Sequence, residues 1–196
     1  MRGEPIQAVN VGLRAMLNAL RQDPHALESV YICIITFDAD VRVVLPLTAL
    51  DEVTVPEIRT PDSGPTHLGR GLDVLCQRVD REVLRTSPDR KGDWMPLLFV
   101  MTDGSPSDRQ LYETMIPEVK KRGFANIVGC AAGPRARGDA LNLLADHVVS
   151  LDTTDSATFT QFFQWVSTAV AIGNRSVGKT TKVMLPPAPP EIQVVF

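Results

Sequence analysis

Apolar residues recur along this chain with two different spacings, and the two spacings alternate. Over residues 4–22 they return every three or four positions, which predicts a helix that ends at Asp23 and Pro24. The next run, SVYICIITFD at residues 29–38, is mostly β-branched and aromatic, as in a strand buried on both faces. A short turn then leads into VRVVLPL, so the two segments predict a β-hairpin, and Pro46 favours an edge position for its second strand.

Helical and strand spacings keep alternating toward the end of the chain. After a loop, the pattern predicts a helix over 68–83, a strand over 96–102, a helix through 112–119, a glycine-broken strand over 125–133, a short helix over 140–146, a strand over 147–152 and a helix over 155–172. This alternation predicts an α/β fold, with a doubly wound, mostly parallel sheet and helices on both faces. We expect one domain over 1–173, followed by a proline-rich tail over 174–196 that ends in EIQVVF, a candidate for one more strand.

Composition narrows the classes of protein to which the chain can belong. Of its 196 residues 44% are hydrophobic and 22% are charged, which is ordinary for a globular domain and argues against disorder. The net charge is −3 without a basic cluster, and the apolar runs are too short for a membrane span, so neither nucleic acid nor a membrane is an expected partner. The start lacks the pattern of a signal peptide, and three dissimilar cysteines make no disulfide framework. We therefore expect the cytoplasm.

One stretch, GNRSVGKT at residues 173–180, matches the G-x-x-x-x-G-K-[ST] pattern of phosphate-binding loops. A working phosphate loop joins a buried strand to a following helix, whose N-terminus helps to hold the phosphates. Here the preceding segment has helical spacing, and the prolines soon afterwards prevent a useful helix. We interpret the stretch as the end of the last helix and the start of a flexible connection.

Two loops carry oxygen donors where an α/β sheet places its ligands, at the carboxyl ends of the strands. Asp103 directly follows the apolar strand FVMT, and Thr66 lies just before a predicted helix. A carboxylate and a hydroxyl suit a hard cation such as Mg²⁺, although Asp-Gly is also a common turn and Thr a common N-cap. His67 adjoins Thr66 and either approaches such a site or faces solvent. Ser105, Ser107 and Asp108 are either supports behind such a site or, within SPSD, the N-cap of the next helix. Asp38 and Asp40 are interpreted as turn residues.

The order of these segments resembles that of the von Willebrand factor A (vWA) domain, and within it the bacterial TerY-like group associated with tellurium resistance. The resemblance covers about residues 1–172, and it is carried most specifically by RGEPI, ITFD, KGDW and MTDG. It implies a doubly wound fold with a metal-ion-dependent adhesion site. That site holds its metal through an Asp-x-Ser-x-Ser motif after the first strand, a Thr that matches Thr66 and an Asp that matches Asp103.

The chain departs from the family at its beginning, because it has no Asp-x-Ser-x-Ser there. The resemblance implies that the central strand and three ligands are missing, through either an internal Met taken as the start or a natural truncation. The strands at 30–37 and 97–101 would then have unpaired edges, and EIQVVF is the candidate to fill the gap, from the same chain or by exchange in a homo-oligomer. Closure of the sheet by direct pairing of the two edges is the alternative. With Thr66 and Asp103 alone, we expect weak Mg²⁺ binding or none.

Two classes of function remain open at this stage. The first is a non-enzymatic protein-interaction module of a tellurium-resistance or stress-response system, whose partners, by resemblance, include kinase- and phosphatase-like proteins. The second is a magnesium- or nucleotide-dependent phosphoryl-transfer enzyme that uses Asp103 or the 173–180 stretch. The first is favoured because no general base or charge clamp is visible around Asp103.

Overall fold

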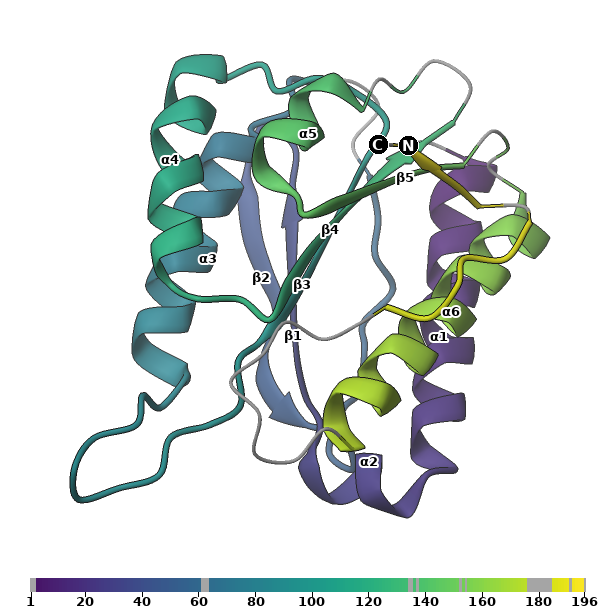
Figure 1. The fold of residues 1–196 in the computed structure, drawn as a ribbon. Helices are drawn as coiled ribbons and strands as arrows, with labels where there is room; N and C mark the ends of the chain where they lie inside the picture. Colours follow the sequence, from purple (N-terminus) through teal and green to yellow (C-terminus); the bar gives the residue numbers. More distant parts are fainter. Residues whose placement is uncertain are drawn as a thin grey trace.

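The computed structural model describes residues 3–60, 64–133, 136, 138–151, 153, 155–175, 185–190 and 192–195. Helices and strands alternate along most of this part of the chain (Figure 1). In order they are α1 (Glu4–Arg21), α2 (Pro24–Ser29), β1 (Tyr31–Phe37), β2 (Val41–Ala49), α3 (Leu68–Glu82), β3 (Leu97–Thr102), α4 (Arg109–Lys121), β4 (Asn126–Ala132), α5 (Asp139–Leu144), β5 (His147–Leu151), α6 (Ser156–Arg175) and β6 (Gln193–Val195).

Backbone pairing divides the strands into two sheets. β3, β4 and β5 are parallel neighbours, and β6 pairs antiparallel with the outer side of β5. β1 and β2 form a separate antiparallel hairpin, as the sequence predicts, and Pro46 lies on its outer strand. The fold is therefore mixed α/β, with three parallel strands flanked by helices and an additional two-stranded sheet.

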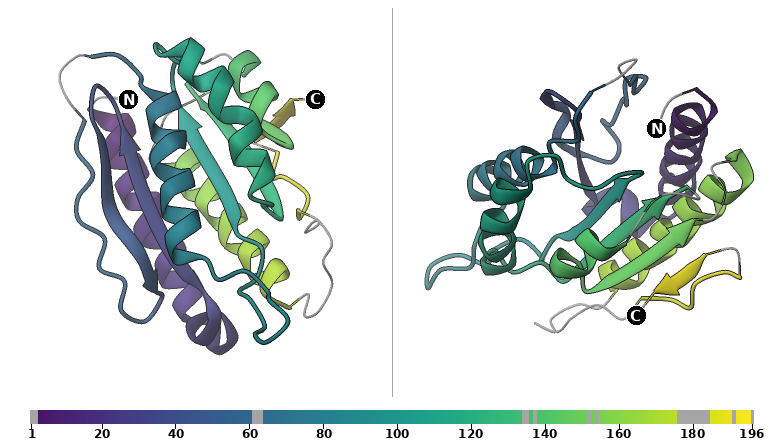
Figure 2. Two further views of the ribbon diagram at one scale, coloured as in Figure 1. Left: turned by 90° about the vertical axis from the view of Figure 1, so that its left-hand side faces the viewer. Right: turned by 90° about the horizontal axis from the view of Figure 1, so that it is seen from above.

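Helices cover both faces of this strand layer (Figures 1 and 2). On one face α1 packs along α6, and their apolar sides form a core with residues of β4 and β5 such as Val128 and Val149. On the other face α3 packs against α4, and this second core includes Tyr112 and Val119. Strand β4, which lies between the two cores, is buried at every position.

The strand over 125–133 does not break at its glycine, contrary to the prediction. β4 runs through Gly129, which pairs with Val100 on one side and Val148 on the other. A Cβ at Gly129 would lie 3.0 Å from Leu141 Cβ, so the missing side chain makes room for α5. The glycine therefore serves helix packing rather than a turn.

The expectation that EIQVVF fills a gap within its own sheet is wrong. β6 pairs with β5 at the far edge, where Val149 lies opposite Val194. β1 and β3 stay in separate sheets, so direct closure between them does not occur either. Exchange of this strand with a second copy stays a prediction.

The described part of the tail packs on the body of the protein. Trp165 of α6 donates its indole N–H to the Pro186 carbonyl at 3.0 Å, and Ile192 is buried in the α1–α6 core. Helix α6 extends to Arg175, so the first three residues of GNRSVGKT are helical, as expected. Residues 176–184, which include the rest of that stretch, lie outside the described residues.

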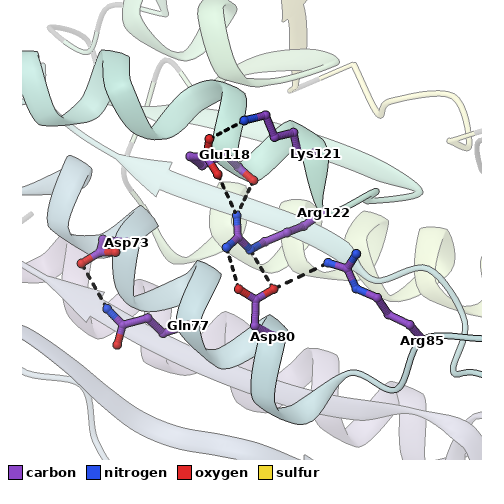
Figure 3. Close-up of polar contacts among 7 residues, drawn as sticks. All are labelled: Asp73, Gln77, Asp80, Arg85, Glu118, Lys121 and Arg122. Carbon is purple, nitrogen blue, oxygen red and sulfur yellow. Dashed lines mark hydrogen bonds and ion pairs between the residues drawn. The ribbon is translucent and has the colours of Figure 1, made fainter.

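A group of charged side chains joins α3 to α4 on the surface (Figure 3). Arg122 donates two hydrogen bonds to the Asp80 carboxylate, at 3.0 and 2.6 Å, in the two-pronged geometry that guanidinium groups favour. Its third nitrogen donates to the Glu118 carbonyl at 2.6 Å, and Lys121 pairs with the Glu118 carboxylate. The hydrogen bond from Arg122 lowers the pKa of Asp80, and the one from Lys121 lowers the pKa of Glu118.

Candidate functional site

The structure brings the loops of Thr66 and Asp103 together, as the sequence predicts for the carboxyl ends of the strands. The Thr66 N–H donates to the Ser107 hydroxyl, and the Ser107 N–H donates to the Thr66 carbonyl, both at 2.9 Å. A Cβ built on Gly104 would lie 3.8 Å from Thr66 Oγ1, so the Thr66 hydroxyl lies beside the residue that follows Asp103. The Asp103 side chain is exposed, and Thr66 is half-buried.

The turn that holds Asp103 is fixed by its neighbours. Thr102, at the end of β3, is buried, and its hydroxyl both accepts from the Gly104 N–H at 3.2 Å and donates to the Gly104 carbonyl at 3.0 Å. These two bonds close the chain around Asp103 directly after the strand. The carboxylate therefore stands on a short turn anchored in the core rather than on a long loop.

Asp108 links the same loop to the start of α3. Its carboxylate accepts from the Gly69 N–H at 3.0 Å and from the Arg70 N–H at 2.9 Å, two of the backbone donors that a helix N-terminus leaves unpaired. Asp108 also occupies the N-cap position of α4, but its side chain makes no capping bond there. The sequence pattern correctly placed Asp108 at the start of α4, yet the side chain serves the other helix.

The turn of the β1–β2 hairpin completes this end of the molecule. Asp38 and Asp40 form a turn, as expected, in which the Asp40 N–H donates to the Asp38 carboxylate at 2.8 Å. The His67 N–H donates to the Asp38 carbonyl at 3.0 Å, and the His67 ring Nδ1 lies 3.0 Å from the Ala39 carbonyl. The three loops at 38–40, 64–67 and 103–108 thus form one hydrogen-bonded group, which we call the loop face.

Sequence reasoning did not find the contacts that assemble the loop face. The Ser107–Thr66 bonds join residues 41 positions apart, and the Asp108–Gly69 bond spans 39 positions. A local pattern cannot indicate which of two helix starts a carboxylate caps. The sequence did show short polar residues near the starts of two helices. It did not show which of these residues bonds to which helix.

The donor set does not fit a tight Mg²⁺ site. Within the part of the chain that the structure describes, no group of three or more His, Cys, Asp or Glu side chains gathers to hold a metal. Thr66 and Asp103 offer two oxygen donors, whereas Mg²⁺ takes six in near-ideal octahedral geometry. The three further ligands that the resemblance to the vWA domain implies have no counterpart among the residues described.

The cysteines do not have the properties of nucleophiles. Burial raises the pKa of the thiols of Cys33, Cys76 and Cys130, most strongly for Cys130 inside β4. A raised pKa leaves little thiolate at neutral pH, and the thiolate is the reactive form. All three are free thiols, as expected from the sequence.

Comparison with known proteins finds structures with a similar fold but does not identify a family. No protein-family model matches the chain, and no curated protein matches it. Two crystal forms of proximal thread matrix protein 1 from the mussel byssus are similar in structure, with TM-scores of 0.60 and 0.57 at 13% sequence identity. The match covers 84% of this chain and 43% or 42% of the mussel protein, so the chain spans less than half the length of that neighbour. At 13% identity the comparison shows a shared α/β arrangement and nothing further.

No helix among the described residues is long and apolar enough to cross a membrane.

Proposed function

We propose that this chain is a non-enzymatic protein-interaction module of the vWA type, similar to the TerY-like group, acting in a cytoplasmic stress-response or tellurium-resistance system. The doubly wound arrangement of that family belongs to the same proposal. The observation that carries it is the loop face, where the loops that follow β1 and β3 and the loop that precedes α3 are tied together by hydrogen bonds. A pre-assembled loop surface on a rigid scaffold is a common way to present recognition residues.

The loop face favours recognition over catalysis. It exposes Asp103, Ser105 and Ser107, which can form hydrogen bonds to a partner. Its histidine, His67, has one ring nitrogen at hydrogen-bonding distance from Ala39 and its backbone N–H bonded to Asp38. His67 thus supports the hairpin turn, and we assign it no role as a general base. Because only the oxygens of Thr66 and Asp103 are available as metal ligands, we propose that Mg²⁺ contributes weakly or not at all to partner binding. Partner binding then rests on the loop surface itself.

Site-specific photo-crosslinking in host cells tests this proposal. A photoreactive residue at Ser105, on the exposed part of the loop face, is expected to give a discrete protein adduct. The control carries the same group at Ser87, an equally exposed serine in the loop after α3, at the opposite end of the strands. Equal adducts at both positions, or none at Ser105, would refute the loop face as the recognition surface.

Two measurements separate the interaction module from the enzyme. Titration calorimetry with MgCl₂ is expected to show at most weak binding. Micromolar affinity for Mg²⁺ that is lost in Asp103→Ala would contradict the proposal that Mg²⁺ binds weakly or not at all. Thermal unfolding with ATP or GTP is expected to show no stabilisation. A nucleotide-dependent shift abolished by Lys179→Ala, a residue outside the described part of the chain, would favour the phosphoryl-transfer alternative.

A further inference from the structure

Residues 185–190, which we call the proline segment, have a burial pattern that repeats every three residues. Four of the six residues are proline, and the other two, Leu185 and Ala188, each precede a proline. Proline holds φ near about −65° and restricts the residue before it to extended backbone, so the sequence favours a polyproline II helix with three residues per turn. Pro187 and Pro190 are exposed, whereas the other four positions are partly buried. One edge of this helix therefore faces solvent, and the other two face the protein.

Trp165 of α6 is the centre of the surface that the proline segment contacts. Its indole N–H donates to the Pro186 carbonyl at 3.0 Å, and the centroid of its ring lies 6.1 Å from that of Phe162. Leu185 and Ala188, which are one turn apart on a threefold helix, both pack on the α1–α6 core. A proline-rich segment offers carbonyl acceptors but few N–H donors, so an aromatic ring that also donates a hydrogen bond suits it. Domains that recognise proline-rich peptides use aromatic grooves in the same way.

The proline segment leads into the strand that covers the outer edge of β5. The Ile192 N–H donates to the Pro189 carbonyl at 2.9 Å, and β6 begins at the next residue. Val194 of β6 lies opposite Val149 of β5, which is fully buried. Figure 1 shows the segment running alongside α6 before the chain reaches β6. We call the proline segment and β6 together the latch, because they cover α6 and the β5 edge one after the other.

The composition of the latch limits the number of hydrogen bonds that hold it in place. Its four prolines have no N–H to donate, and β6 pairs with β5 over three residues, whereas β4 pairs with β5 over five. Apolar packing and the bond from Trp165 carry the contact of the proline segment. Partly buried segments with few hydrogen bonds open at a lower free energy than the core of a protein. We therefore expect the latch to open while β4 and the two cores stay folded.

We propose that α6 carries a binding site for a polyproline II segment, built around Trp165, and that the chain's own residues 185–190 occupy it as a releasable ligand. Release uncovers the Trp165 ring and, together with β6, the outer edge of β5. A free strand edge is a template for pairing, so the latch controls whether this edge is accessible. The site uses no residue of the loop face. The inference therefore stands or fails separately from the function proposed for that face.

Amide hydrogen exchange on the full chain tests whether the latch opens by itself. The protected amides of residues 192–195 are expected to exchange at least about tenfold faster than those of β4. Their exchange should depend little on urea, because a local opening exposes little surface. If both sets of amides exchanged through the same urea-dependent opening, the tail would belong to the global folding unit and the proposal would be overturned.

Matched variants of the proline segment and of the two tryptophans test the geometry of the site. Ala188→Lys places a charge on the edge that packs on the core, so exchange at residues 192–195 is expected to rise at least about tenfold while β4 is unchanged. Pro187→Lys places the same charge on the exposed edge and should change exchange by less than about threefold. Trp165→Phe keeps a ring but removes the donor to Pro186, and an increase of about fivefold is expected, with none for the exposed Trp94→Phe. Equal effects within either pair would contradict the site.

Synthetic peptides test the class of ligand. The probe is acetylated Leu-Pro-Pro-Ala-Pro-Pro amide, and the matched control is Leu-Gly-Gly-Ala-Gly-Gly, which lacks the preformed helix. In a Trp94→Phe background Trp165 is the remaining tryptophan, so its fluorescence reports binding. With the latch opened by Ala188→Lys, the proline peptide is expected to bind at least about tenfold more tightly than the glycine peptide. It should bind more weakly to the chain with Ala188 intact, where the resident segment competes at a high effective concentration. Equal binding of the two peptides, or no binding of either to the opened variant, would refute the inference.

Discussion

Replacement of Asp108 by alanine removes the cap of a helix 39 residues away in the sequence. The Asp108 carboxylate accepts from two backbone N–H groups at the start of α3, at 3.0 and 2.9 Å. Loss of an N-cap costs about 1 kcal/mol, and loss of a negative charge at a helix N-terminus costs about 0.3–1 kcal/mol more. With a second donor also left without its acceptor, we expect Asp108→Ala to lower the free energy of unfolding by about 2 kcal/mol. Asp108→Asn keeps one acceptor oxygen and is expected to lose about half as much.

Urea unfolding followed by tryptophan fluorescence measures this loss, because Trp165 is buried in the α1–α6 core and becomes exposed on unfolding. The control is Asp89→Ala, at an exposed carboxylate in the loop after α3, with an expected change below about 0.5 kcal/mol. The backbone bond from the Tyr112 N–H to the Asp108 carbonyl survives the substitution, so α4 keeps its first turn. If Asp108→Ala and Asp89→Ala unfolded at the same urea concentration, the capping role would be refuted.

Two further predictions concern the α3–α4 interface. A methyl group at Gly69 would lie 2.5 Å from the Tyr112 backbone nitrogen, so Gly69→Ala should cost about 2 kcal/mol in thermal or urea unfolding despite its better helix propensity. Gly71→Ala, in the same helix but with Phe37 no nearer than 3.4 Å, should be neutral or stabilising, and equal losses at both glycines would contradict this packing. The lowered pKa of Asp80 means that its pairing with Arg122 stabilises the fold above the unfolded pKa and ceases to do so as pH falls through the lower folded value. Asp80→Asn should therefore destabilise the protein at about pH 7 but much less at about pH 3, and a deficit that stays constant with pH would contradict the ion pair.

Local pattern was sufficient for the order of most helices and strands. The helical spacing of apolar residues predicted α1, because a helix buries one face. A continuous apolar run predicted β3, because this strand lies between helices on both faces. Short α2 was not predicted, since PHALES is too brief to show a helical period. The break at Gly129 was wrong because a glycine that admits a neighbouring helix looks the same in sequence as one that ends a strand.

Long-range pairing was the part that the sequence could not provide. The sequence EIQVVF is typical of a strand, but it does not specify whether that strand pairs with β5 or lies between the strands at 30–37 and 97–101. The approach of the Thr66 and Asp103 loops followed from the general geometry of α/β sheets. The hydrogen bonds that hold them, through Ser107 and Asp108, join residues about forty positions apart and required coordinates.

The division of the strands into two sheets has a consequence for how the protein loses its structure. Hydrogen-bonded ladders transmit cooperativity, and among the residues that the structure describes no ladder joins the β1–β2 hairpin to the β3–β6 sheet. The hairpin is attached through side-chain packing and through the bond from the His67 N–H to the Asp38 carbonyl at its turn. At the other end, Arg21 of α1 donates to the carbonyl of Leu50, directly after β2. We therefore expect two unfolding units, with the hairpin opening at a lower free energy than the sheet centred on β4.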